Sequence, residues 1–169
     1  SRNHIFGSVF AGLFVIGIVI MIISGSRTLG EFSKQATVTN HEKMGSPSDT
    51  LYLTAKQGQS ERDLEAIIDP DLNFNRFRIG TLNGKDIFIG IPEVWIEKSD
   101  NNEFDLVINK ISRGLNMSSA KQNADDILFN YQIKDSLINI QTSYILPKIW
   151  RNQRINLKIN VPIGKTIFL

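Results

Sequence analysis

The sequence contains no cysteine and only two histidines. Without cysteine there are no disulfides, no thiolate catalysis and no cysteine-ligated metals. His4 lies beside an apolar run and His41 in a polar segment, so no Ser-His-Asp triad can form on a rigid scaffold. Dinucleotide-binding glycine fingerprints, Walker loops and H-E-x-x-H are also missing. We therefore expect a protein that is not an enzyme, with no cofactor and no metal.

The chain also lacks a strong charge of one sign, because its formal net charge is only +2 over 169 residues. Nucleic-acid binding depends on neutralising many phosphates with Lys and Arg. A nearly balanced charge gives no case for a nucleic-acid partner.

One long apolar run is present, from Ile5 to Ser24, and it carries no charged side chain. About 20 helical residues cross the roughly 30 Å hydrocarbon core of a bilayer. The run predicts a transmembrane helix with a short flank over residues 1–24. Basic residues flank both ends, so the positive-inside rule does not select an orientation. A cleaved signal peptide is the alternative, but its apolar region is normally shorter.

Four small residues share one side of this helix: Gly7, Ser8, Ala11 and Gly12. Small residues spaced four apart let transmembrane helices approach closely. We expect the lipid bilayer and other transmembrane helices, of the same or a partner chain, as partners of this segment. Composition typical of any membrane helix explains the same residues without a contact.

Beyond the helix, residues 25–49 are rich in Ser, Thr, Gly, Lys and Asn. So polar a segment has little apolar surface to bury. It is interpreted as a polar linker, followed over residues 50–169 by one extracytoplasmic domain. Because the chain starts at Ser1 and stops after an apolar run at Leu169, we expect it to come from a longer protein.

Alternating apolar and polar residues predict several strands in the domain. Asn83-Gly84 suits a two-residue turn between two alternating runs, which predicts a hairpin over about 76–91. Further strands are expected at 51–55, 94–97, 104–108, 131–133, 137–144 and 155–161. Many short strands with few helices favour a mainly β fold, either a sandwich or a β-solenoid.

Two short amphipathic helices are expected within the domain. The first covers about Ser60 to Ile68, where Ser60 and Asp63 form an approximate capping box. The second follows Ser118 or Ser119 as its cap, and its apolar face is expected to run from Ala120 to Leu128.

Three groups of side chains were weighed as sites. Side chains with oxygen ligands alternate from Asp69 to Asn75, but the segment lacks the glycine and the glutamate of a calcium loop. An ordinary turn is therefore favoured. Asp125 and Asp126 point about 100° apart on a helix and form no carboxylate pair. Trp150, Arg151 and Arg154 form a basic, aromatic cluster suited to surface contact with phosphates or lipid headgroups, although Arg stacked on Trp explains it without a ligand.

The segments Ser112 to Ile140 and Leu146 to Leu169 resemble the C-terminal region of phage-shock-protein-C (PspC) domain-containing membrane proteins of Bacteroidetes. The matching pieces include Ser112-Arg113-Gly114, the Ala-rich helix and the Trp150-Arg151-Asn152-Gln153 segment. The resemblance implies a bacterial inner-membrane protein with a periplasmic β domain and a role in the envelope stress response. The β region also resembles adhesin-type β-solenoids. The small PspC domain itself would lie before Ser1.

The leading hypothesis is therefore a non-enzymatic, membrane-anchored sensor or regulator of envelope stress, with an envelope protein as a further partner. The alternative is a structural or adhesin-like β scaffold of the cell envelope. An enzyme using carboxylates alone needs two acids converging in a cleft, and the sequence indicates no such pair.

Overall fold

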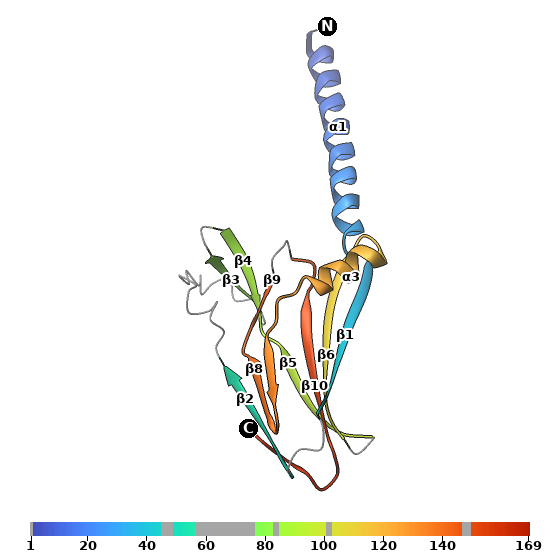
Figure 1. Cartoon of the computed structure of the whole chain (residues 1–169). Coiled ribbons are helices and arrows are strands. Elements are labelled where there is room, and N and C mark those ends of the chain that lie inside the picture. Colours follow the sequence, from blue (N-terminus) through green and yellow to red (C-terminus); the bar gives the residue numbers. More distant parts are fainter. Residues whose placement is uncertain (1, 45–48, 57–76, 83–84, 101–102, 147–149) are drawn as a thin grey trace.

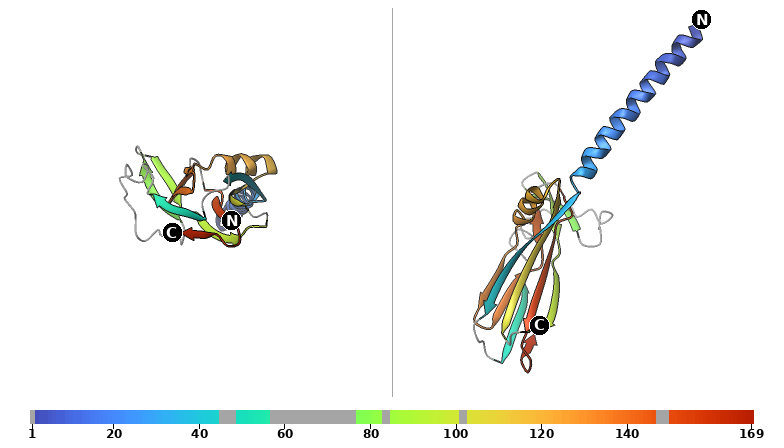
Figure 2. Two further views of the ribbon diagram at one scale, coloured as in Figure 1. Left: turned by 60° about the horizontal axis from the view of Figure 1, so that its bottom comes forward. Right: turned by 90° about the vertical axis from the view of Figure 1, so that its right-hand side faces the viewer.

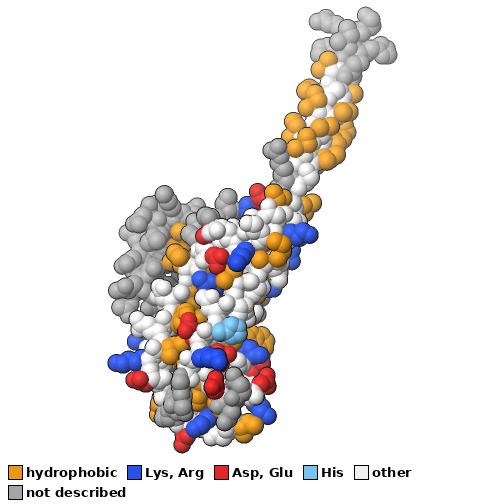
Figure 3. Space-filling model, turned by 45° about the vertical axis from the view of Figure 1, so that its right-hand side comes forward, with side chains coloured by type: hydrophobic (Ala, Val, Ile, Leu, Met, Phe, Trp, Pro, Cys, Tyr) orange, Lys and Arg blue, Asp and Glu red, His pale blue; other side chains and the backbone are white. Residues whose placement is uncertain are grey.

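The computed structural model describes residues 2–44, 49–56, 77–82, 85–100, 103–146 and 150–169. It consists of one long helix that projects from a β domain (Figure 1). Helix α1 spans Arg2–Gly30, which at 1.5 Å per residue is about 43 Å. Its window Val9–Ser26 is long and apolar enough to cross a membrane, and none of it is buried. Hydrophobic side chains cover the visible face of its described part (Figure 3).

The first sheet of the domain contains four strands in the order β1-β6-β10-β5. Strand β6 pairs antiparallel with β1 and β10, whereas β10 pairs parallel with β5. The strand bounds are β1 Lys34–Met44, β5 Glu93–Lys98, β6 Phe104–Gly114 and β10 Arg154–Val161.

Two smaller sheets lie beside the first. One has the order β11-β2-β8-β7, and the other has the order β3-β4-β9. Their strands are β2 Thr50–Lys56, β7 Tyr131–Lys134, β8 Leu137–Gln141 and β11 Thr166–Phe168, then β3 Phe77–Leu82, β4 Lys85–Gly90 and β9 Tyr144–Leu146. Figure 2 shows that the long strands lie along one common axis of the domain, although neighbours such as β6 and β10 point in opposite directions.

The hydrophobic core lies between these sheets. Along β10, Ile155, Leu157 and Ile159 are fully buried and pack with Leu106 and Ile108 of β6. Opposite them the cluster includes residues of the other two sheets: Leu51, Leu53, Ile138, Ile140, Tyr144 and Leu146. Strand geometry explains this, because successive side chains point to opposite faces and only one face of each sheet meets the core. The mainly β prediction is confirmed, with sandwich-like packing and some of the parallel ladders found in solenoids.

Helix α3 spans Met117–Asp125 and lies where β6 ends. The sequence indicated Ser118 or Ser119 as its N-cap, but the N-cap is Asn116. Ser119 is the third helical residue and completes a reciprocal capping box with Asn116. Gly114 is needed before it, because an added Cβ would lie 2.5 Å from the backbone nitrogen of Ala120. The predicted apolar face is too long by one turn: Leu128 lies beyond the helix in an isolated bridge.

Much of the segment interpreted as a polar linker lies in regular secondary structure. Helix α1 continues to Gly30, and β1 then pairs with β6 over all of its eleven residues. The prediction failed because backbone ladders do not require apolar side chains, and an edge strand buries only one face. In β1 that face is marked by Ala36 and Met44, a pattern too sparse to stand out in a polar stretch.

The other strand predictions have mixed outcomes. The hairpin is confirmed in β3 and β4, which pair antiparallel, and its turn at 83–84 lies outside the described residues. The run 137–144 is divided between β8 and β9. The expected helix at 60–68 and the oxygen-rich segment from Asp69 also lie outside the described residues.

Candidate functional site at the junction of helix and β domain

Helix α1 passes into the β domain through only three residues, Glu31, Phe32 and Ser33. The amide nitrogens of Phe32 and Ser33 donate hydrogen bonds to the carbonyls of Leu29 and Gly30, each at 3.1 Å. Such bonds close the last turn of the helix. Strand β1 begins at the next residue, so the helix is joined to the sheet without a flexible spacer. We call these three residues, with the side chains that hold them, the junction.

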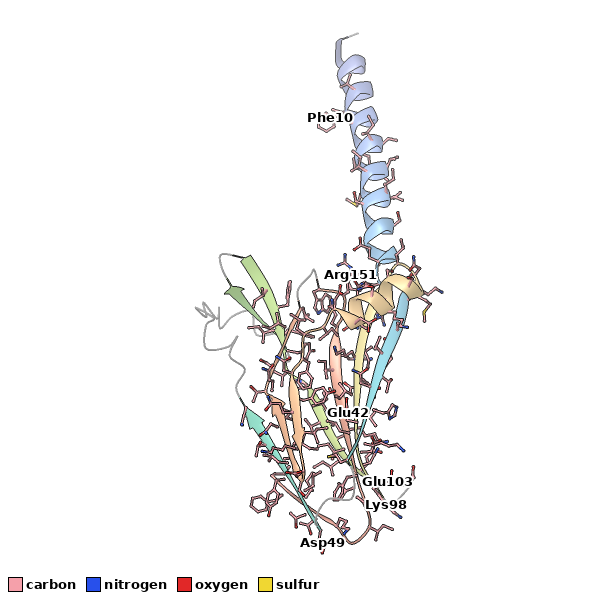
Figure 4. All side chains as sticks on the ribbon, viewed as in Figure 1. Phe10, Glu42, Asp49, Lys98, Glu103 and Arg151 are labelled. Carbon is pink, nitrogen blue, oxygen red and sulfur yellow. The ribbon has the colours of Figure 1, made fainter. Side chains whose placement is uncertain are left out.

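The junction is held from the far end of the sequence by Arg151. Its guanidinium nitrogen Nη2 forms an ion pair with the Glu31 carboxylate, and its Cζ lies 5.6 Å from the centre of the Phe32 ring. The Arg151 side chain is only 18% exposed, whereas that of Glu31 is 47% exposed. A cation over an aromatic ring and beside a carboxylate is stabilised by both. Figure 4 shows Arg151 at the end of the domain that α1 enters.

An aromatic cluster adds a second contact at the same place. The Phe32 ring lies 5.8 Å from the Trp150 ring, and Trp150 in turn meets Phe77 at 6.3 Å in an edge-on arrangement. Both geometries are among those that aromatic pairs prefer. Since Phe77 begins β3, the cluster connects the helix exit to the hairpin as well as to the segment before β10.

Residues at and just after the end of β6 complete the junction. Arg113 donates from Nη1 to the Phe32 carbonyl at 3.3 Å, and the Ser33 hydroxyl donates to the Leu115 carbonyl at 3.0 Å. The Arg113 amide also donates to the Arg151 carbonyl at 2.9 Å. The end of β6 therefore contacts both the helix exit and the segment that carries Arg151.

The junction joins α1 to the sheet by side-chain and backbone contacts. Within the described residues, no group of three His, Asp or Glu side chains is placed to hold a metal ion. Asp125 is exposed, while Asp126 accepts a hydrogen bond from Gln122 at 2.8 Å. A displacement of α1 would pass through the junction into β1 and, along its full ladder, into β6.

The structure separates the three residues of the predicted basic cluster. Trp150 and Arg151 belong to the junction, whereas Arg154 is exposed at the start of β10. The sequence had suggested an arginine stacked on Trp150. In the structure Arg151 packs over the Phe32 ring instead. The guanidinium that was considered for a phosphate is already paired with Glu31. Surface contact by this group stays a prediction.

The four small residues of the helix all lie in α1. An added Cβ on Gly12 would meet no atom within 4 Å, and Ala11 is exposed. Packing of Gly7, Ser8, Ala11 and Gly12 against another helix stays a prediction.

Sequence reasoning missed Glu31, Phe32 and Arg113 as residues of the junction. Glu31-Phe32 stands just after the apolar helix, and a charged and an aromatic residue at that point are a usable signal for an anchored helix end. Their partner Arg151 is 120 positions away, so no local spacing could reveal the pairing.

Comparison with known protein families identifies the family of the β domain. Residues 83–169, just over half of the chain, match the model of the C-terminal toast-rack domain found in some PspC proteins. No curated protein and no solved structure matches the chain. The family description names no bacterial group, so the Bacteroidetes source stays an expectation. The matched region contains β5, β6, α3, β10 and the Arg151 side of the junction, and by this match the chain belongs to the PspC C-terminal toast-rack family.

Proposed function

We propose that this chain is a non-enzymatic, membrane-anchored envelope protein that senses or regulates the envelope stress response. In this proposal α1 is an anchor in the bacterial inner membrane and the β domain lies in the periplasm. Membership of a PspC family supports an association with the envelope stress response. Fold-family membership does not by itself identify a function, so the argument depends on the junction.

The observation that carries the proposal is the short, cross-linked path from α1 into the sheet. A simple anchor needs no such path, because a flexible linker tethers a domain equally well. Here the helix exit is bound by an ion pair, a cation–π contact and an aromatic cluster from residues 150–151 and Phe77, and by hydrogen bonds from the end of β6. A domain that reports on its surroundings through its helix requires this kind of stiffness.

The proposal is tested in the native host with an envelope-stress reporter. We expect Arg151→Ala to change reporter output, while Arg154→Ala leaves it at the wild-type level, because Arg151 contacts the helix exit and the exposed Arg154 is not part of the junction. Immunoblots of membrane fractions establish equal protein amounts. Deletion of residues 50–169 should abolish the regulated response. A response unchanged by that deletion would refute the sensor role.

The same experiments separate the alternative of a structural or adhesin-like scaffold. A scaffold would tolerate Arg151→Ala without a change in reporter output, and affinity purification would recover envelope proteins or glycans instead of stress regulators. Protease accessibility in spheroplasts tests the periplasmic placement, since a domain on that side is cleaved without lysis.

A further inference from the structure

Three exposed apolar side chains surround the base of α1. Leu29 is 76% exposed on the helix, Leu115 is 61% exposed after β6, and Met117 is 58% exposed at the first position of α3. We call these three residues the rim. Figure 3 shows hydrophobic side chains on the end of the domain next to α1, interspersed with Lys and Arg. None of the rim belongs to the core cluster of the β domain.

The rim lies at a defined height relative to the apolar helix. The membrane-compatible window ends at Ser26, and four further helical residues to Gly30 add about 6 Å. The polar interface of a bilayer is about 5–7 Å thick on each side. Leu115 lies at the level of Gly30, because its Cδ1 is 3.3 Å from a Cβ added there. With Ser26 at the hydrocarbon boundary and α1 along the bilayer normal, Leu29 and Leu115 therefore lie within the headgroup layer, and Met117 follows two residues after Leu115.

We propose that the rim docks on the bilayer surface, with Leu115 and Met117 inserted in the headgroup layer. The inference rests on α1 being the membrane anchor, as proposed above. The occupant is a lipid surface because Leu29 lies on α1 itself, three residues beyond the membrane-compatible window that ends at Ser26, and Leu115 lies beside the next residue, Gly30.

The side chains around the rim fit the same occupant. Helix α3 turns Ala120 and Ala124 into the domain and exposes Met117 and Lys121. An interfacial helix combines apolar side chains with Lys or Arg in this way. Trp150, at the neighbouring junction, is 38% exposed, and indole rings favour the headgroup level.

Other exposed apolar side chains do not share this position. Ile163 is 71% exposed in the turn between β10 and β11, and that turn lies at the opposite end of the domain (Figure 1). It provides a matched control, because it is as exposed as the rim but is far from α1.

The test uses the full chain reconstituted in phospholipid vesicles. Since the natural sequence has no cysteine, Met117→Cys and Ile163→Cys each carry a single environment-sensitive fluorophore. The vesicles also contain lipids that carry a nitroxide high on the acyl chain, next to the headgroup. We expect a loss of fluorescence at position 117 and none at 163. Adding Leu115→Gln to Met117→Cys should reduce the loss, with circular dichroism reporting an intact fold.

Each other result overturns the proposal. Quenching at 117 by a water-soluble quencher but not by lipid nitroxide means that the rim faces water. Protection from both quenchers means that a protein covers it. Failure of α1 as an anchor is seen separately, because the protein would then not float with the vesicles. The reporter assay described above tests the regulatory role independently of this measurement.

Discussion

Replacing Arg151 by Ala should loosen the junction without unfolding the domain. The variant loses the ion pair with Glu31 and the cation–π contact with Phe32. The Glu31 side chain is 47% exposed, so its pairing is worth about 0.5–1 kcal/mol. The cation–π contact adds about 0.5–1 kcal/mol. The free energy of opening the junction should therefore fall by roughly 1–2 kcal/mol, a factor of about 5–30 in the opening equilibrium.

Amide hydrogen exchange of the full chain in lipid nanodiscs measures this opening directly. The amides of Phe32 and Ser33 donate to Leu29 and Gly30, so they exchange only when the junction opens. We expect both to exchange about 5–30 times faster in Arg151→Ala. The matched control is Arg154→Ala, which removes an exposed arginine three positions away and should leave these two amides at the wild-type rate.

A double-mutant cycle with Glu31→Gln isolates the ion pair. Its coupling free energy should be about 0.5–1 kcal/mol and should shrink in 1 M salt, where the screening length is about 3 Å. Equal exchange in Arg151→Ala and Arg154→Ala would refute the role of Arg151 in holding the helix exit. Additive effects in the cycle would mean that the ion pair contributes nothing to the stability of the junction.

Three further predictions concern the domain. Gly90→Ala should lower the free energy of unfolding by about 1–3 kcal/mol, because its Cβ would lie 2.1 Å from the buried ring of Tyr144. Leu157→Ala, at a fully buried position, should cost about 2–5 kcal/mol. Tyr131→Phe removes the 2.6 Å hydrogen bond to Glu42 that joins β7 to β1 and should cost about 0.5–1.5 kcal/mol. Burial, with the Glu42 hydrogen bond, raises the pKa of Tyr131 to about 12, so this stability is present below pH 10 and is lost as the pH rises toward 12.

Chemical denaturation followed by circular dichroism measures all three changes. Gly12→Ala is the control for the glycine substitution, because no atom lies within 4 Å of its added Cβ. An unchanged midpoint in Gly90→Ala or Leu157→Ala would contradict the packing described for the core. For Tyr131, ultraviolet absorbance should show a tyrosinate transition near pH 12 that disappears in Tyr131→Phe. If the transition that Tyr131→Phe removes lies instead at the ordinary tyrosine value near 10, that result would argue against the bond to Glu42.

The sequence by itself determined the elements whose periodicity is strong. The uninterrupted apolar run predicts α1 because length and composition alone decide whether a helix can cross a bilayer. The alternation Ile155, Leu157, Ile159 predicts β10 and its buried face, since a strand repeats every two residues. Asn83-Gly84 predicts a two-residue turn that joins two such runs into a hairpin. These features are local, and their physical causes act over a few residues.

Only the tertiary structure decided which distant segments meet. Strand β1 is formed by ladder bonds to β6, about 70 positions away in sequence, as the Thr39 to Asn109 side-chain bond illustrates. Its polar side chains gave no sign of that pairing. The junction likewise depends on Arg151 reaching Glu31 across the fold. Backbone pairing and ion pairs depend on proximity, which follows from the packing of the whole chain and not from local residue spacing.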